Sequence, residues 1–473
     1  MRIAFVASEA FPYAKTGGLA DVAGALPKAL ALLGEECVLF LPMYPGIDAE
    51  ATGLSFEVKL GRRKEPAQVF ASRNPFPAYF IRNDGFFNRP GLYGTERADY
   101  PDNLERFAFF VRAALEAAIR LGLKPDILHL HDWQAALAAP HLRAHPRKAL
   151  KGTKTIFTIH NLGYQGVFAK EKFELLNLPA DYYGVQGVEF YDQINLLKGG
   201  LVYADFLTTV SPTYAQEIQT NEYGCGLEGV LRERTTSLRG ILNGIDTEVW
   251  NPARDRHIYY NYRDPKDKQI NKIQLRKELG LEPDEGPIIG LVSRLAGQKG
   301  IDLFCDAFKT IIQWGFQIVI LGTGDEKYQL TLSELATRFA GRVSLNLKFD
   351  EQLAHRIYSG ADFFLMPSRY EPCGLGQMIA LIYSTIPVVR KTGGLADSVF
   401  EFDPGSGLGN GFLFEDYKTG ALLAALKRAR EVYDNPQLWA TLVANSKKYD
   451  FSWTRAAREY QTLYRQLLQT KNQ

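Results

Sequence analysis

The chain has 473 residues, of which 55 are lysine or arginine and 53 are aspartate or glutamate, so its net charge is only +2. This balance excludes a molecule-wide field for nucleic acid or a membrane surface, and any anion site must be local. With 46% hydrophobic residues, the chain is long enough for two or three domains with sizeable cores. The four cysteines (Cys37, Cys225, Cys305 and Cys373) are far apart, which fits a reducing compartment rather than a disulfide scaffold or zinc ribbon.

The first half of the sequence alternates short apolar runs with helical patterns. We expect strands at Ile3–Ser8, Cys37–Leu41, Ile127–Leu130, Lys154–Ile159, Phe206–Val210 and Leu238–Leu242. We expect helices at Leu19–Leu33, Leu104–Leu121, Gln134–Leu142 and Ile194–Ala204, and a β-meander at Ser55–Arg82. Continuous apolar strands that alternate with helices predict a doubly wound α/β domain.

Polar residues follow four of these expected strands. They are His131-Asp132-Trp133, His160-Asn161, Ser211-Pro212 and Asn243-Gly244. Ligands of doubly wound domains bind beyond the carboxyl ends of the strands. The pattern therefore predicts an active-site rim at this end of the sheet.

A polar stretch from Trp250 to Lys268 interrupts the alternation and indicates a domain hinge. A second alternation follows, with strands expected at Pro287–Ser293, Gln317–Gly322, Arg342–Leu347, Asp362–Pro367 and Ile386–Arg390. Helices are expected at Gly300–Trp314, Glu326–Phe339, Glu351–Gly360 and Gly374–Tyr383. We expect one Rossmann-like domain over residues 1–251 and a second over 252–452. A C-terminal helix, assigned to 453–473 with its amphipathic part at Trp453–Gln469, would complete the first domain.

The heptapeptide Lys-Thr-Gly-Gly-Leu-Ala-Asp occurs twice, at residues 15–21 and 391–397. Each copy follows an expected strand and leads into a helix-like stretch. Glycines at such a turn present bare N–H groups to an anion, and the lysine adds a positive charge. A single Gly-Gly pair is usually a plain turn, but two copies predict two similar half-molecules that offer one loop each to the same cleft.

Basic residues accompany these loops. Arg294 and Gln298-Lys299-Gly300 follow the first strand of the second half, and Arg369–Gly374 follows the fourth. Lys15, Arg294 and Lys299 suit a leaving diphosphate, whose developing charge needs fixed donors. The sequence contains neither an Asp-x-Asp pair for a divalent metal nor a Walker-type P-loop. We therefore expect side chains and backbone N–H groups to stabilise the diphosphate, with no metal and no cofactor.

Several of these residues also have a purely structural interpretation. His129 and His131 would share one face of a strand without an obvious third ligand, which disfavours a metal site. His160 alone is compatible with a hydrogen-bonded core histidine, and Trp133 with core packing. Cys373 lacks an adjacent base, so a backbone and packing role is favoured over a nucleophile.

The ordered motifs K-T-G-G-L-A-D-V, H-D-W, T-I-H-N-L-G-Y-Q-G, I-L-N-G-I-D-T-E-V-W-N-P, S-R-L-A-G-Q-K-G and E-P-C-G-L resemble the bacterial and plastid type of glycogen or starch synthase. The resemblance spans the chain from Ile3 to the final helix. It implies a GT-B architecture, in which two doubly wound Rossmann-like domains face each other across a cleft. The N-terminal domain would lie on the acceptor side, and the C-terminal domain would bind the nucleotide sugar.

The same resemblance implies a retaining glucosyltransferase that extends an α-1,4-glucan, glycogen or starch, or a maltooligosaccharide, from ADP-glucose. UDP-glucose as the donor, or a GT-B transferase with a small acceptor, stays open as an alternative. A non-catalytic glucan-binding scaffold is disfavoured because Lys15, Arg294, Lys299 and Glu371 are all retained. A pyridoxal-phosphate phosphorylase is disfavoured because such enzymes are far longer.

Residue roles are carried over from the resemblance. Glu371 would stabilise an oxocarbenium-like state in front-face substitution rather than act as a nucleophile. Arg294 and Lys299 would neutralise the diphosphate, and His160 and Asp132 would line the reacting centre. The implied substrate-binding residues are Lys15, Gly17, Gly18, Asp21, Tyr93, Trp133, Asn161, Asn243, Gln298, Phe349, Cys373, Gly374, Leu375, Thr392 and Gly393.

Three positions depart from the family pattern. Gly376 stands where threonine is common, Gln134 replaces a frequent histidine, and Phe349 occupies a position that is often tyrosine.

No nucleic-acid or membrane partner is expected, and the oligomeric state stays open. The implied compartment is the cytoplasm, or the plastid stroma for a processed plant or algal chain.

Overall fold

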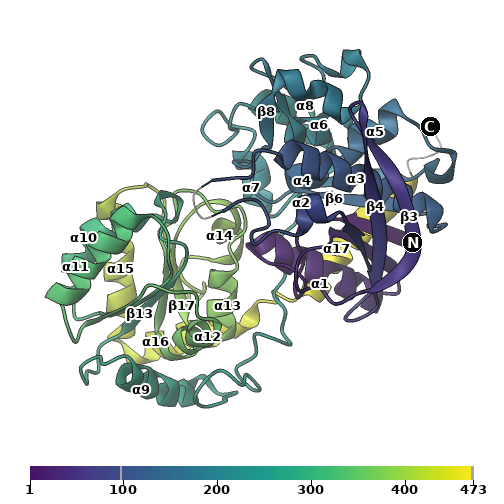
Figure 1. Ribbon diagram of the computed structural model, residues 1–473. Coiled ribbons are helices and arrows are strands. Elements are labelled where there is room, and N and C mark those ends of the chain that lie inside the picture. Colours follow the sequence, from purple (N-terminus) through teal and green to yellow (C-terminus); the bar gives the residue numbers. More distant parts are fainter. Residues whose placement is uncertain (96–97, 470–473) are drawn as a thin grey trace. The chain divides into compact units, whose positions relative to one another are not determined.

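The computed structural model describes residues 1–95 and 98–469. The chain folds into two compact units (Figure 1), one formed by Met1–Gly244 with the chain from Trp453 onward, and the other by Ile245–Ser452. The chain passes from the first unit to the second after Gly244 and returns to the first unit at Trp453. These two connections lie side by side, because the Ile245 N–H donates to the Phe451 carbonyl at 2.7 Å. The first connection thus lies at residue 244, whereas the sequence suggested 251. The C-terminal helix α17 spans Trp453–Gln469, and residues 470–473 of the expected helix lie outside the described residues.

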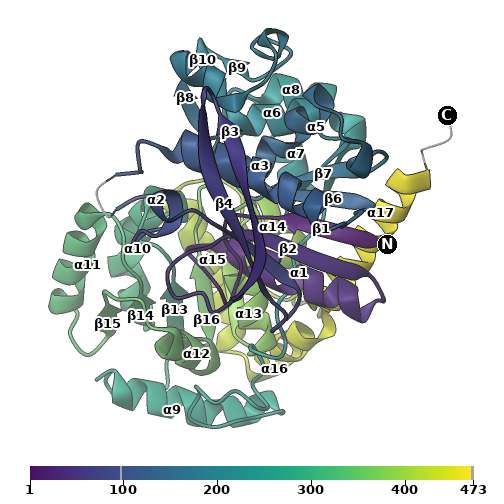
Figure 2. The same cartoon turned by 45° about the vertical axis from the view of Figure 1, so that its right-hand side comes forward.

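The N-terminal unit is built on a mixed sheet. Its strands are β1 (Arg2–Val6), β2 (Glu36–Pro42), β3 (Glu50–Leu60), β4 (Arg63–Ser72), β5 (Ala78–Arg82), β6 (Ile127–His131), β7 (Lys154–Ile159), β11 (Phe206–Thr209) and β12 (Leu238–Gly240). Their order is β12-β11-β7-β6-β1-β2-β5-β4-β3. Pairing is parallel from β12 to β5 and antiparallel through β4 and β3, whose long pair stands out in Figure 2. This confirms the expected meander.

The helices of this unit are α1 (Gly18–Leu32), α2 (Asp84–Phe87), α3 (Asn103–Arg120), α4 (Asp132–Ala136), α5 (Ala138–Ala144), α6 (Leu196–Tyr203), α7 (Pro212–Glu217), α8 (Glu228–Glu233) and α17. Helix α17 packs against α1, as its apolar stripe requires. Within residues 1–95 and 98–469, no helix combines the length and apolarity that a bilayer crossing requires.

Two helix predictions in this unit were wrong in part. The stretch expected as one helix over Gln134–Leu142 is two short helices, α4 and α5, which meet at Leu137. The helix expected over Ile194–Ala204 begins only at Leu196, because Gln193–Asn195 form strand β10 of a small antiparallel sheet with β8 (Val167–Ala169) and β9 (Glu189–Phe190). The Asn195 side chain then caps α6 by accepting the Lys198 N–H.

The C-terminal unit is a parallel doubly wound sheet. Its strands are β13 (Ile288–Val292), β14 (Gln317–Leu321), β15 (Val343–Asn346), β16 (Phe363–Met366), β17 (Ile386–Arg390) and β18 (Phe412–Phe414), in the order β15-β14-β13-β16-β17-β18. Its helices are α9 (Lys268–Glu278), α10 (Ile301–Gln313), α11 (Glu326–Arg338), α12 (Glu351–Gly360), α13 (Gly376–Ile382), α14 (Gly393–Ser398), α15 (Thr419–Tyr433) and α16 (Pro436–Asn445). Counted from β13, this is the 3-2-1-4-5-6 order of dinucleotide-binding domains.

Both faces of this second sheet are buried. Ile289 and Ile318 pack in one core with residues of α10, α11, α15 and α16, whereas Ile288 and Val319 pack in another with residues of α9 and α12. Neighbouring strand residues point to opposite faces, so continuous apolar runs are required. Figure 1 shows α10, α11 and α15 gathered on one side of β13 and β17.

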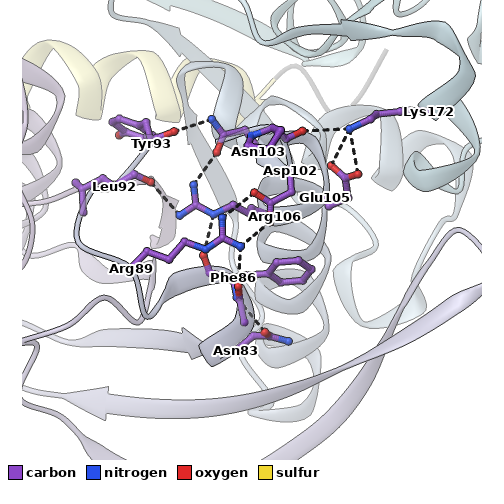
Figure 3. A network of polar contacts seen from close by, with 12 residues as sticks. Asn83, Phe86, Arg89, Leu92, Tyr93, Asp102, Asn103, Glu105, Arg106 and Lys172 are labelled. Atoms are coloured by element: carbon purple, nitrogen blue, oxygen red, sulfur yellow. Dashed lines mark hydrogen bonds and ion pairs between the residues drawn. The ribbon is translucent and has the colours of Figure 1, made fainter. Parts of the chain in front are cut away.

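A buried arginine organises the start of α3 (Figure 3). The guanidinium of Arg106, which is fully buried, donates to the carbonyls of Phe86 (2.8 Å) and Leu92 (3.0 Å) and to the side-chain oxygen of Asn103 (2.6 Å). Asn103 in turn donates to the Tyr93 carbonyl at 2.8 Å. The network therefore fastens the loop that contains Tyr93 to the start of α3.

Replacing Arg106 by methionine should destabilise the N-terminal unit by about 3 kcal/mol or more, because two buried acceptors and one partly buried acceptor each lose a donor at roughly 1 kcal/mol or more. Urea unfolding measures this change. Arg120→Met on the same helix is the matched control. The exposed pair of Arg120 with Glu116 stabilises by at most about 1 kcal/mol. Equal effects of the two substitutions would contradict the structural role of Arg106.

Candidate active site

In each unit, several of the expected site residues follow the two strands between which the strand order of the sheet reverses. In the N-terminal unit the reversal lies between β1 and β6, which precede the first heptapeptide and the His131-Asp132-Trp133 motif. In the C-terminal unit it lies between β13 and β16, which precede Arg294–Lys299 and Glu371. Loops leave such neighbouring strands toward opposite faces and open a crevice at their carboxyl ends.

The first heptapeptide is held by a carboxylate that the sequence analysis did not single out. Oε2 of Glu9 accepts the N–H of Thr16 (2.5 Å), the hydroxyl of Thr16 (2.9 Å) and the N–H of Gly17 (3.3 Å). Burial raises the pKa of Glu9, and these hydrogen bonds oppose the rise. The Gly17 N–H is therefore already engaged by a carboxyl group of the chain itself. An acidic residue in the mostly apolar stretch shortly after β1 was the available signal in the sequence.

Lys15 lies at the start of the same loop and is partly exposed. Its Nζ is 2.6 Å from Oδ1 of Asp21, on the first turn of α1, and 5.7 Å from the centre of the Phe11 ring. Gly18 begins α1 with Gly17 as its N-cap residue. The positive end of this helix dipole and the lysine therefore lie on the same loop.

Tyr93 joins the glycine loop to the Arg106 network. Its hydroxyl is 2.7 Å from the Ser8 hydroxyl and donates to Oε1 of Glu9 at 3.3 Å. Burial raises the pKa of Tyr93 well above its usual range, so the hydroxyl stays protonated and able to donate. Through Tyr93, the packing of α3 fixes the carboxylate that holds the loop.

Asp132 and His160 come together at the ends of β6 and β7. Oδ1 of Asp132 accepts the His160 N–H at 2.7 Å, and Asp132 has a left-handed φ of 55°. Non-glycine residues adopt this conformation uncommonly, and often at functional sites. Burial raises the pKa of Asp132 to about 7, despite the hydrogen bonds that lower it.

His131 orients His160 from behind. Its Nδ1 lies 2.8 Å from Nε2 of His160, and its Nε2 is buried with no hydrogen-bond partner among the described residues. A buried N–H without a partner is rarer than a bare acceptor. The arrangement thus favours an Nδ1–H on His131, which donates to His160. His160 then carries its own hydrogen on Nδ1.

His129 is a core residue, not a ligand poised for metal. Its Nδ1 is 2.8 Å from the Tyr464 hydroxyl of α17, its Nε2 is 2.6 Å from the Thr158 hydroxyl, and its ring stacks 4.3 Å from that of His131. Trp133 is also packed, with only 9% of its surface exposed, against Phe107 and Phe168. The core interpretation fits both residues.

Asn161 and Asn243 complete the N-terminal rim. Oδ1 of Asn161 accepts the Gly163 N–H at 3.0 Å, which closes the turn after β7. Asn243 is buried after β12, and its Oδ1 has no partner among the described residues. Such an unpaired buried oxygen is costly unless a ligand satisfies it. Gln134 likewise has an unpaired buried Oε1.

The C-terminal rim is centred on an ion pair between two strand ends. Nζ of Lys299, after β13, donates to Oε2 of Glu371, after β16, at 2.6 Å. The Ser368 hydroxyl donates to the same oxygen at 3.0 Å. Glu371 is 6% exposed, and its Oε1 has no hydrogen bond to the described residues. One carboxylate oxygen is thus held by the chain and the other is left for a ligand.

Arg294 and Gln298 flank this pair. Arg294 is exposed, and its Nη2 lies 3.5 Å from Oε1 of Gln298, whose Nε2 lies 3.4 Å from the Tyr370 carbonyl. The Arg369 N–H donates to the Gln298 carbonyl at 2.8 Å. The loops after β13 and β16 are therefore bonded to each other.

The second heptapeptide packs directly onto the Glu371 loop. The Gly394 N–H reaches the carbonyls of Glu371 (3.1 Å) and Pro372 (3.2 Å). A Cβ at Gly393 would lie 2.0 Å from the Glu371 carbonyl oxygen, and the φ of Gly393 is +44°. Only glycine fits there. Thr392 is the buried N-cap residue of α14.

The loop after Glu371 begins α13. Gly374 has φ +69°, and the Gln377 amide donates to the carbonyls of Cys373 (3.1 Å) and Gly374 (2.9 Å). Leu375 is the N-cap residue of α13. A Cβ at Gly376 would lie 2.8 Å from the Phe364 ring, so the threonine common in the family would require a shift here. Phe349, by contrast, is 89% exposed and available for stacking.

Two family descriptions match this chain. "Starch synthase catalytic domain" matches residues 2–233, and "Glycosyl transferases group 1" matches residues 272–448. Glycogen synthases of Geotalea uraniireducens and Thermotoga petrophila are 46% and 45% identical to the chain, over 100% and 99% of both partners respectively.

Solved structures show the same similarity. The catalytic domain of starch synthase IV from Arabidopsis thaliana, bound to ADP and acarbose, superposes with a TM-score of 0.91 at 36% identity, over 99% of each chain. A sucrose-phosphate synthase from Thermosynechococcus elongatus, at 20% identity and a TM-score of 0.64, shares the fold. These similarities confirm the expected fold class.

Buried histidines should make the N-terminal unit acid-labile. Burial lowers the pKa of His129, His141 and His160 to about 3 and that of His131 well below its usual range. Below about pH 6.5 the unfolded chain binds these protons and the folded chain does not, so stability falls as pH falls. Asp132 acts oppositely, since it holds a proton in the folded state up to about pH 7.

Unfolding takes up protons at the four imidazoles and releases one from the Asp132 carboxyl. The free energy of unfolding should therefore fall by about 4 kcal/mol per pH unit between roughly pH 6 and 4. Urea unfolding at pH 7, 6 and 5 measures it. His141→Gln should lower the number of protons taken up on unfolding by about one, and Asp132→Asn should raise it by about one. Equal stability at pH 7 and pH 5 would contradict the burial of neutral histidines.

Proposed function

The chain belongs to the family of glycogen and starch synthases, and on that premise we propose that it extends an α-1,4-glucan by transferring glucose from ADP-glucose with retention of configuration. The single observation that carries the catalytic part of the proposal is the Lys299–Glu371 pair at the strand-order reversal of the C-terminal sheet. ADP is favoured as the nucleotide because the related Arabidopsis starch synthase was solved with ADP.

In the proposed mechanism, cations of the C-terminal rim neutralise the leaving diphosphate. Lys299 is fixed by Glu371 beside the reacting centre, and the exposed Arg294 guanidinium can grip two phosphate oxygens at once. Thr392 and Gly393, at the start of α14, are proposed to contact the same diphosphate. Phe349 stacks on the base. Together these groups stabilise charge that develops only as the sugar–phosphate bond breaks.

Glu371 is proposed to stabilise the cationic sugar. Its Oε2 is held by Lys299 and Ser368, which leaves Oε1 to interact with the glucose in the proposed complex. Gln298 and the backbone of Cys373, Gly374 and Leu375 hold the sugar hydroxyls. Because Oε2 is engaged by two donors, the carboxylate suits an electrostatic role better than nucleophilic attack.

Residues of the N-terminal rim are proposed to act on the glucose and the acceptor. His160, with its hydrogen on Nδ1, donates to a sugar oxygen, and Asp132 and Asn161 fix its loop. The bare Oδ1 of Asn243 accepts a sugar hydroxyl. Lys15 and the Gly18 backbone contact the diphosphate, whereas the Gly17 N–H is available only if Glu9 releases it. Trp133 and Tyr93 are proposed to pack beneath the residues that contact the sugar and to hold them in place.

Glu371→Gln and Lys299→Met should each lower kcat for glucose transfer by at least 100-fold, because each removes a charge aimed at the transition state. Radiolabelled glucose incorporated into glycogen from ADP-glucose is the readout. Lys391→Met is the matched control, since Lys391 follows the neighbouring strand but pairs with Glu415 in solvent. Full kcat in Glu371→Gln would overturn the assigned role.

The donor and acceptor can be tested in one assay. Incorporation into glycogen should be faster with ADP-glucose than with UDP-glucose and unchanged by EDTA, because side chains rather than a divalent ion are proposed to neutralise the diphosphate. Label that appears only in a small product would favour the small-acceptor alternative. Loss of transfer in EDTA, restored by Mg²⁺, would contradict the proposed charge stabilisation.

A further inference from the structure

A groove of about 910 Å³ lies on the N-terminal unit, away from the rim described above. Its walls come from β3, the second half of α3, the end of α5 with the segment after it, and residues 174–179. Because α5 leads toward the start of β7, its end lies near the amino ends of the strands, whereas the rim lies at their carboxyl ends. The size is that of a site for a small metabolite.

Carboxylates on the groove wall are already neutralised. Each is paired with a cation that is not part of the lining: Glu57 with Lys64 (2.8 Å), Glu116 with Arg120 (2.6 Å) and Glu174 with Arg62 (2.8 Å). Each of these ion pairs largely cancels the negative charge of its carboxylate. The acids therefore offset little of any positive charge inside the groove.

Cations on the same wall are not neutralised. Arg112, Arg147 and Lys59 line the groove, and none has a carboxylate within 4.0 Å among residues 1–95 and 98–469. Arg112 donates through Nη1 to the Lys59 carbonyl and to Oδ1 of Asn177, which are neutral acceptors. Burial, and secondly the charge of Arg147, lower the pKa of Arg112 to about 10. Two guanidinium groups thus repel each other here without a counter-charge.

Two histidines add structure but no negative charge. Nε2 of His141 is 2.8 Å from the Leu176 carbonyl, and Nε2 of His145 is 2.8 Å from the Asn177 carbonyl. A carbonyl only accepts, so both rings carry a hydrogen on Nε2. These bonds fasten the end of α5 to the segment that holds Asn177. The cationic wall is therefore assembled before any ligand binds.

We propose that this groove binds a phosphorylated small molecule, through Arg112, Arg147 and Lys59. Guanidinium groups match the oxygens of a phosphoryl group in paired hydrogen bonds, and three cations without a carboxylate partner match its multiple charge. A bound phosphoryl group would also remove the repulsion between the two arginines. This site is separate from the proposed transfer reaction and does not depend on it.

Isothermal titration calorimetry of the full chain tests the proposal, with inorganic phosphate and glucose 1-phosphate as probes. Saturating ADP is present throughout to fill the proposed donor site. We expect one probe-binding event that persists in ADP. Arg147→Glu and Lys59→Ala should each weaken it about tenfold or more, the effect of losing one charge-assisted hydrogen bond. Both side chains are exposed, so these variants keep the fold.

Arg143→Ala is the matched control, because Arg143 is an exposed arginine on α5 that pairs with Asp205 and does not line the groove. It should bind the probes like the unaltered chain. Tighter binding of glucose 1-phosphate than of phosphate would identify a sugar phosphate, and equal binding would identify free phosphate. Binding that ADP abolishes, binding equal in Arg147→Glu and Arg143→Ala, or no binding of either probe would each overturn the proposal.

Discussion

The C-terminal rim depends on holding Lys299 and Glu371 together although they follow different strands. Adjacent strand ends meet there because the sheet order reverses between β13 and β16. Close backbone contacts then lock the loops. A Cβ at Gly300 would lie 2.0 Å from the Pro367 carbonyl oxygen, and one at Gly393 equally close to that of Glu371. Fixed charges of this kind need no reorganisation during a reaction, which is what electrostatic catalysis requires.

The two copies of the heptapeptide show how tertiary context changes the meaning of one local sequence. In the first copy, backbone N–H groups donate to the buried carboxylate of Glu9. In the second, the Gly394 N–H donates to carbonyls of the Glu371 loop. The lysines also differ, since Lys15 pairs with Asp21 inside its own copy and Lys391 pairs with Glu415 outside it. Both copies form a strand–turn–helix junction, but what each glycine touches is decided by the neighbouring strand.

Strand positions and the clustering of polar residues at strand ends followed from the sequence, because apolar periodicity and the doubly wound pattern are local signals. The β8–β10–β9 sheet did not, since strands of two or three residues carry no periodicity. Glu9 was overlooked because its partners lie on a turn that only the fold brings back to it. Likewise, the packing of the Trp133 ring against Phe107 and Phe168 depends on long-range contacts that the sequence does not show.

A net charge of +2 conceals how charges are sorted in space. On the wall of the α3–α5 groove, Glu116 turns to Arg120 one helical turn away, while Arg112 on the same helix points to neutral acceptors. An i,i+4 pair of this kind is worth only a few tenths of a kcal/mol. It nevertheless decides the local field, because it removes the acid that would otherwise face the arginine. Composition counts both charges equally and cannot register this. In a nearly neutral protein, an anion site can therefore form where the nearby acids are already paired with other cations, without an excess of basic residues.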